Sequence, residues 1–127
     1  ENVLSTRHNA KPVHSLGEIF QLMKAFPDEI QLYTAIHEDK VVAGALMYVT
    51  PIVAHTQYIA SNEEGRKCCA LDLLFDELVN KVFREKRYFD FGTSNSNDGR
   101  NLETGLLFQK ESYGGRGIAY DEWNLTI

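Results

Sequence analysis

Apolar residues recur along the chain in helical and in strand-like patterns, and these patterns predict its first helix and its strands. Between Ser15 and Phe26 the apolar side chains recur at helical spacing, and Pro27 ends the pattern. Ser15 with Glu18 three residues later has the form of a capping box, which marks the start of a helix. We therefore expect a helix that begins at Ser15 and stops before Pro27.

Three strand-like segments follow, Ile30 to Ile36, Val41 to Val49 and Val53 to about Ala60, and short turns join them. Consecutive strands with short links pair as an antiparallel meander. The second segment is apolar on both faces, which predicts a central strand. Gly44 inside it indicates a bulge or a close approach of another backbone.

The second half of the chain alternates predicted helices and strands. A long helix is expected from about Lys67 to Lys86, with acidic residues early and basic residues late, as the helix dipole favours. A short strand, Tyr88 to Phe91, comes next, and then a helix capped by Asn101. A last strand from Ile118 to Ile127 would use Trp123 as a bulky anchor. The whole order predicts an α+β fold.

The segment from Thr93 to Arg100 is the polar loop that follows the short aromatic strand. It consists mostly of Ser, Asn, Thr, Asp and Arg, more hydrogen-bonding capacity than a connector needs. This composition favours a binding loop. A surface turn around Asp98 and Gly99 is the alternative, and composition alone does not separate the two.

Composition and charge narrow the function classes. The chain has 127 residues, a formal net charge of −5 and 43% hydrophobic residues, which suits one globular domain. We assign residues 13–127 to that domain and residues 1–12 to a possible linker from a truncated upstream region. Because the basic residues are scattered, we expect no nucleic-acid binding. No apolar run approaches the length of a membrane span, so the cytoplasm is the expected location.

Metal and disulfide chemistry find little support in the sequence. Cys68 and Cys69 are adjacent, so a bridge between them is sterically poor, and we expect both to be small packing residues at a helix start. The four histidines show no ligand spacing. No metal is therefore predicted.

The block from Phe89 to Gly115 carries the most specific pattern, with DFG, TSNSNDGR, GL, FQK and YGG in order. Together with the order of elements, it resembles the GNAT acyltransferase superfamily, and within it the FemAB and BioF2-like acetyltransferase group. The resemblance implies a GNAT-like, mixed and mainly antiparallel central sheet with helices on both faces. Because such domains often occur in tandem, it also implies that residues 13–127 are the C-terminal domain of a longer protein, with an upstream GNAT-like domain as partner.

The resemblance implies acyl-CoA, typically acetyl-CoA, as the donor co-substrate. Its pyrophosphate would lie at the amino end of the long helix, where unpaired N–H groups favour anions. This chain matches the usual glycine pattern only at Gly65, while Glu63 and Glu64 would repel phosphate unless they point away. The cofactor-binding candidates are Asn62, Gly65, Arg66, Lys67 and Cys68.

Transfer to an amine needs a base and a proton donor. His55 and Asp90 are the candidate bases, although a structural hydrogen bond is the simpler interpretation of Asp90. Phe108 stands where many relatives carry a tyrosine acid, which leaves Ser94, Tyr113 or water as the donor. The substrate-binding candidates are Thr93, Ser94, Asn95, Asn97, Arg100 and Lys110.

Two functions follow from this resemblance. The first is N-acyl transfer to an amine of a small molecule or a peptidoglycan-like precursor. The alternative is a catalytically degenerate binding or scaffold module within a tandem-domain protein, which the poor phosphate loop and Phe108 favour.

Overall fold

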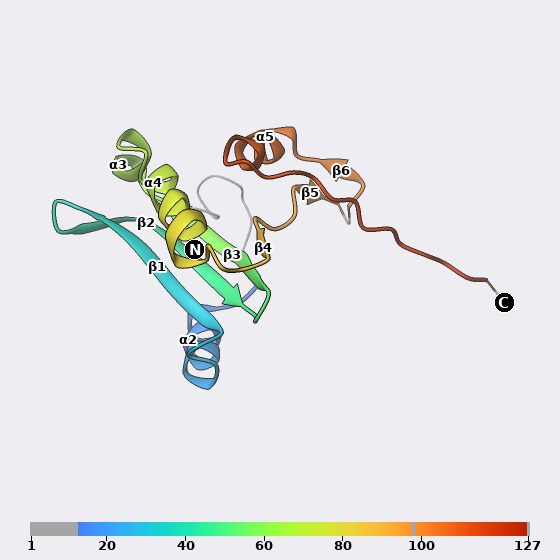
Figure 1. Cartoon of the computed structure of the whole chain (residues 1–127), viewed down its shortest axis with the longest axis horizontal. Coiled ribbons are helices and arrows are strands. Elements are labelled where there is room, and N and C mark those ends of the chain that lie inside the picture. The colour runs from blue at the N-terminus through green and yellow to red at the C-terminus, as the bar shows by residue number, and fades with distance from the viewer. Residues whose placement is uncertain (1–12, 98, 127) are drawn as a thin grey trace. The chain divides into compact units, whose positions relative to one another are not determined.

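The structure, a computed structural model, describes residues 13–97 and 99–126 (Figure 1). The expected linker at residues 1–12 and Asp98 of the expected turn lie outside these ranges. The chain divides after Gly92 into two compact units. The first holds the large sheet, and the second begins at Thr93.

Helix α2, Leu16–Ala25, begins with the expected capping box. The Ser15 N–H donates to Glu18 Oε2 at 2.6 Å, and the Glu18 N–H donates to Ser15 Oγ at 3.3 Å. The Ser15 backbone hydrogen bond is the main cause that lowers the pKa of Glu18. The helix ends with Phe26 as its C-cap, directly before Pro27, so both predicted boundaries are confirmed.

The first unit contains a four-stranded sheet in the order β1-β2-β3-β4 (Figure 1). The strands are β1, Ile30–His37, β2, Lys40–Val49, β3, Val53–Ser61, and β4, Tyr88–Asp90. The first three form an antiparallel meander, and β4 pairs with β3 in parallel. The mainly antiparallel mixed sheet is therefore confirmed, with β2 inside it as predicted.

The two irregularities of the sheet do not lie at Gly44. Gly44 is in register with both neighbouring strands, and a Cβ there would meet no atom closer than 3.5 Å, so the predicted bulge or close approach is wrong. The β2–β3 register instead passes from Thr56 to Tyr58 and leaves Gln57 without a partner on β2. Such a bulge twists a strand and redirects its side chains.

The predicted continuous helix from Lys67 to Lys86 is wrong. It is replaced by α3, Glu63–Lys67, α4, Ala70–Glu77, and a π-helical turn, η1, Leu78–Val82. The break falls at Cys69, whose φ of 54° is left-handed and cannot continue an α-helix. Cys68 and Cys69 are exposed, so the packing role expected for them is also wrong.

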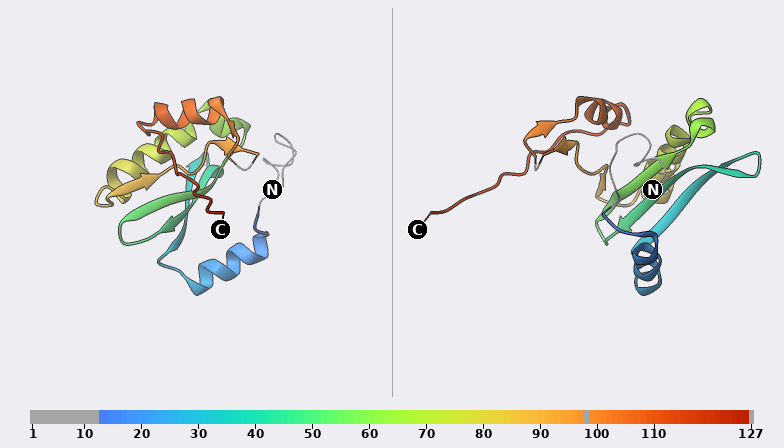
Figure 2. Two further views of the ribbon diagram at one scale, coloured as in Figure 1. Left: turned by 90° about the vertical axis from the view of Figure 1, so that its right-hand side faces the viewer. Right: turned by 180° about the vertical axis from the view of Figure 1, so that it is seen from behind.

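The core lies between the sheet and α4 with η1. Helix α4 covers one face of the sheet, and α2 lies at the end of the sheet where β1 begins (Figure 2). Met47 and Leu78 are the largest fully buried side chains. Phe75 of α4 meets Phe89 and Phe91 at ring-centroid distances of 6.3 Å and 5.4 Å, which anchors β4 beneath the helix.

The second unit contains a small antiparallel hairpin, β5, Asn95–Ser96, with β6, Asn101–Leu102, and helix α5, Thr104–Ser112. Asn101 belongs to β6, and Glu103 is the N-cap of α5, so the predicted cap is wrong. Residues 118–126 form no strand, contrary to prediction, and the Trp123 side chain is 89% exposed rather than an anchor. No helix among the described residues has the length and apolarity to cross a membrane.

Candidate functional site at the two ends of β3

Strands β3 and β4 pair over a short distance only. Tyr88, Phe89 and Asp90 of β4 pair in register with Val53, Ala54 and His55, and β3 then continues to Ser61 with no β4 partner. Gly92, with a left-handed φ of 75°, follows the end of β4. The last pair in the ladder, His55 with Asp90, therefore marks the place where the two strands cease to be joined.

Two of the predicted catalytic residues, His55 and Asp90, meet at this place. His55 Nδ1 lies 2.7 Å from Asp90 Oδ2, and the Gly92 N–H donates to Asp90 Oδ1 at 2.8 Å. The carboxylate is thus held on both oxygens, and because an ionised carboxylate only accepts hydrogen bonds, His55 Nδ1–H is the donor of this pair. The side chains remain 33% and 47% exposed, so a substrate can reach them.

Two further side chains stand beside His55, and sequence reasoning missed both. Gln57 Oε1 lies 3.3 Å from His55 Nε2, and the Tyr48 ring is tilted against the imidazole at a centroid distance of 6.4 Å. The Tyr48 hydroxyl is buried and has no hydrogen-bond partner among the described residues. Burial, with Tyr58 nearby, raises the pKa of Tyr48 and keeps the hydroxyl protonated.

Gly65, the central residue of the expected phosphate loop, lies at the other end of β3. Its N–H already donates to Asn62 Oδ1 at 2.8 Å, because Asn62 is the N-cap of α3. A Cβ at Gly65 would lie 2.3 Å from Val42 O and 2.6 Å from Ser61 Oγ. The glycine is therefore required by the close packing of α3 on the sheet.

The other cofactor-binding candidates at this end also make internal contacts. Arg66 Nη1 donates to Ser61 O at 2.8 Å, and the Lys67 ammonium lies 2.9 Å from Glu63 Oε1. The Cys68 thiol contacts Gly65 O at 3.7 Å. The fold brings the five candidates together, yet each of them already has a partner within the domain.

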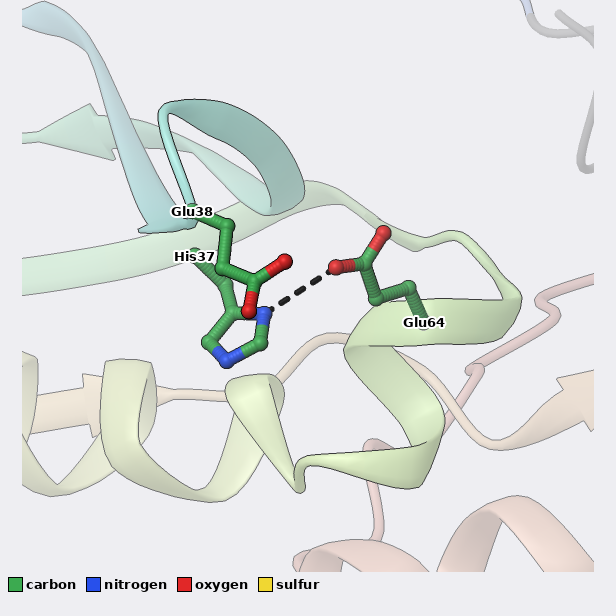
Figure 3. A group of neighbouring side chains, drawn as sticks. All are labelled: His37, Glu38 and Glu64. Carbon is green, nitrogen blue, oxygen red and sulfur yellow. Dashed lines mark hydrogen bonds and ion pairs between the residues drawn. The ribbon is translucent and has the colours of Figure 1, made fainter.

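Glu64, the second acidic residue of this loop, turns toward the β1–β2 turn (Figure 3). His37 Nδ1 lies 3.0 Å from Glu64 Oε1, and this hydrogen bond is the main cause that lowers the pKa of Glu64. Glu38 lies beside this pair. One ring nitrogen of His37 and one carboxylate oxygen each of Glu38 and Glu64, the atom types that bind metal ions, lie within 4.8 Å of one another. Both acidic residues that would repel a phosphate are therefore paired.

The remaining predicted catalytic residues lie in the second unit. The Ser94 carbonyl accepts the Glu103 N–H at 2.8 Å, which ties the loop to the start of α5. Tyr113 is the C-cap of α5, and its N–H donates to the Lys110 carbonyl at 3.2 Å. The Phe108 side chain is 75% exposed. The catalytic roles of Ser94 and Tyr113 stay predictions.

The predicted substrate-binding residues form the hairpin and its supports. Asn95 donates its N–H to Thr93 Oγ1 at 3.2 Å, and the Lys110 ammonium donates to the Thr93 carbonyl. Asn97 has a left-handed φ of 51°, and its carbonyl accepts the Arg100 N–H at 3.1 Å. These contacts build a turn, and acceptor binding by this loop stays a prediction.

Residues 5–99 match the family described as the acetyltransferase (GNAT) domain. The chain therefore belongs to this family. The fold is also that of a crystal structure described as a possible acetyltransferase from Clostridium difficile 630, with a TM-score of 0.66, 12% identity, and coverage of 99% of this chain and 85% of that one. No curated protein matches the chain.

Proposed function

We propose that the domain transfers an acyl group from acyl-CoA to an amine, with His55 as the general base. The observation that carries the proposal is the His55–Asp90 pair at the last joined position of β3 and β4. A histidine whose Nδ1–H is held by a carboxylate presents a basic Nε2, and this arrangement suits proton removal from an attacking amine.

The chemistry follows from these positions. As the amine nitrogen bonds to the acyl carbon, one amine proton passes to His55 Nε2. The carbon–sulfur bond then breaks, and the thiolate of CoA leaves and takes a proton from water. Asp90 stabilises the imidazolium, and backbone N–H groups of β3 beyond His55 are the candidate donors to the acyl oxygen.

The finer features are proposals from the sequence resemblance. They place the chain in the FemAB and BioF2-like group, with acetyl-CoA as donor, a cell-wall-type precursor as acceptor, a cytoplasmic location and an upstream GNAT-like domain. For the donor site, Lys67 is the residue whose release from Glu63 would give CoA a cationic phosphate contact, because this ion pair is exposed.

Release of CoA thiol from acetyl-CoA in the presence of a panel of amines tests the proposal. Substitution of His55 by Gln should lower kcat/KM by about 10²- to 10⁴-fold, because a glutamine cannot take the proton. His37→Gln is the matched control, since His37 also pairs with a carboxylate and lies on the same sheet. Equal activity of His55→Gln and wild type, both folded, would remove His55 from the mechanism.

A binding or scaffold module is the second candidate, and the internal contacts of the α3 loop favour it. A thermal shift with CoA and acetyl-CoA separates the two functions. Stabilisation by the donor together with amine-dependent thiol release supports the transferase, whereas no stabilisation by either and no thiol release supports the module.

A further inference from the structure

Gln57 is the side chain that meets the second ring nitrogen of His55. The two residues lie two apart on β3, so their side chains share one face of the sheet. Gln57 Oε1 lies 3.3 Å from His55 Nε2, and the Gln57 side chain is half-buried. Because an amide oxygen only accepts hydrogen bonds, Nε2–H is the donor in this contact.

Both ring nitrogens of His55 therefore donate in the structure. Nδ1–H donates to the Asp90 carboxylate, and Nε2–H donates to the Gln57 carboxamide. A histidine with a proton on each nitrogen is an imidazolium, which is the form that His55 takes after it has accepted the amine proton in the proposed reaction. The two neighbours thus satisfy the protonated base from both sides.

We propose that Gln57 is a positioning residue that stabilises the protonated form of His55 during transfer. This inference rests on the proposed function and adds a residue to its site. As the carbon–nitrogen bond forms, one N–H bond of the amine breaks and its proton bonds to His55 Nε2. The Gln57 oxygen accepts a hydrogen bond from this new N–H as the ring becomes cationic. Because a hydrogen bond from a charged donor is stronger than a neutral one, the contact favours the step that creates the charge.

The groups around His55 determine the direction of the effect. Three side chains contact the imidazole, Asp90 from β4, Tyr48 from β2 and Gln57 from β3 itself. Asp90 is the charged one and favours the protonated ring. Tyr48 stays neutral, since burial raises the pKa of its hydroxyl. The Gln57 oxygen accepts only from a protonated Nε2, so its removal must disfavour protonation of the ring.

The pH profile of kcat/KM tests the inference, with acetyl-CoA and the amine of the panel above that gives the fastest thiol release. Gln57→Met keeps the length of the side chain and removes the oxygen. The acid limb should move down by about half to one pH unit, and kcat at high pH should fall about tenfold. Gln57→Glu keeps an oxygen and adds a negative charge, so the acid limb should move up. Gln21→Met, the same change at an exposed position of α2, is the control and should leave the profile unchanged.

A second measurement does not depend on transfer. The ¹⁵N resonances of the His55 ring are followed against pH without donor or acceptor. The midpoint of the transition should move down in Gln57→Met and up in Gln57→Glu, while Gln21→Met should match wild type.

Each outcome of the two measurements decides a different question. A rise in Gln57→Glu without a change in Gln57→Met would leave a charge effect alone and overturn the inference, and so would no shift in either variant, while thiol release by wild type would keep the transferase function. Opposite shifts in the two variants without thiol release by wild type would reject the transferase and keep the pairing of Gln57 with the protonated ring.

Discussion

The two ends of β3 differ in how their polar groups are satisfied. At the α3 end, Asn62, Gly65 and Arg66 are tied to one another and to the neighbouring backbone. At the His55 end, the imidazole and the Asp90 carboxylate are joined but remain accessible to solvent. The end that carries the recognisable motif is therefore closed by structural contacts, and the end without a motif carries the reactive arrangement.

Buried polar atoms without a hydrogen-bond partner also distinguish the two ends of β3. The only buried side-chain oxygens without a partner among the described residues belong to Tyr48 and Thr56, and both lie at the His55 end. Most buried polar groups in native proteins have a partner, either a protein atom or an ordered water molecule. A glycine at the start of a helix identifies a phosphate-binding loop only when the backbone donors there are free, and the Gly65 N–H already donates to Asn62 Oδ1.

Substitution of Gly65 by Ala should have the largest effect and tests the structural role of the α3 end. The added Cβ would overlap backbone Val42 O, which cannot move aside, and we expect a loss of roughly 3 kcal/mol in the free energy of unfolding. Urea unfolding measures it. Loss of CoA binding in this variant would therefore not prove a phosphate contact.

Gly17→Ala is the control for this experiment, because Gly17 lies within α2 and a Cβ there meets no atom within 4 Å. It should gain about 0.5 to 1 kcal/mol from helix propensity. If Gly65→Ala were as stable as Gly17→Ala, the close packing at the α3 end would be wrong.

Asp90→Asn tests the His55 end. An asparagine amide in place of Oδ2 would donate to Nδ1, move the ring proton to Nε2 and remove the basic nitrogen from the acceptor side. We expect kcat to fall about 100-fold with little change in stability. The ¹⁵N shifts of the His55 ring report the tautomer directly, and retention of the Nδ1–H form with full activity would contradict the role of Asp90.

The strands were largely predictable, and their contacts were not. The sequence predicts the three segments of the meander within about one residue of their ends, because apolar composition and short turns are local signals. The chemistry of His55 and of Asp90 makes each a candidate from sequence alone, yet their pairing depends on a parallel register between strands distant in sequence. No local pattern encodes that register.

Three predictions miss contacts or conformations that the local sequence pattern does not show. The helix break at Cys69 is a left-handed residue that helical periodicity does not reveal. The strand predicted from Ile118 to Ile127 rests on apolar and aromatic residues such as Trp123, but a strand exists only with a partner, and residues 118–126 have none among the described residues. The Gly65 motif was interpreted from its neighbours in sequence, whereas its role is set by Val42 on β2.

Tyr48→Phe tests the His55 end of β3 through the free energy of unfolding. Removal of a buried hydroxyl without a partner should raise the free energy of unfolding by about 1 kcal/mol. Tyr58→Phe is the counterpart, because its hydroxyl lies 2.9 Å from His14 Nδ1, and it should lower stability by about 1 kcal/mol. Equal losses in both variants would show that the Tyr48 hydroxyl is already satisfied.

Glu63→Gln should have the smallest effect and asks whether the α3 end can still bind the donor. The change releases the exposed Lys67 ammonium from its ion pair, so CoA binding measured by calorimetry should tighten about two- to threefold. Glu77→Gln is the control, because it releases Lys81 from an equivalent i,i+4 ion pair further along the chain. It should leave the affinity for CoA unchanged. Tightening in both variants would indicate a general charge effect, and tightening in neither would place the CoA phosphates away from α3. Only the selective response makes the α3 end a donor site whose access is limited by its own ion pair.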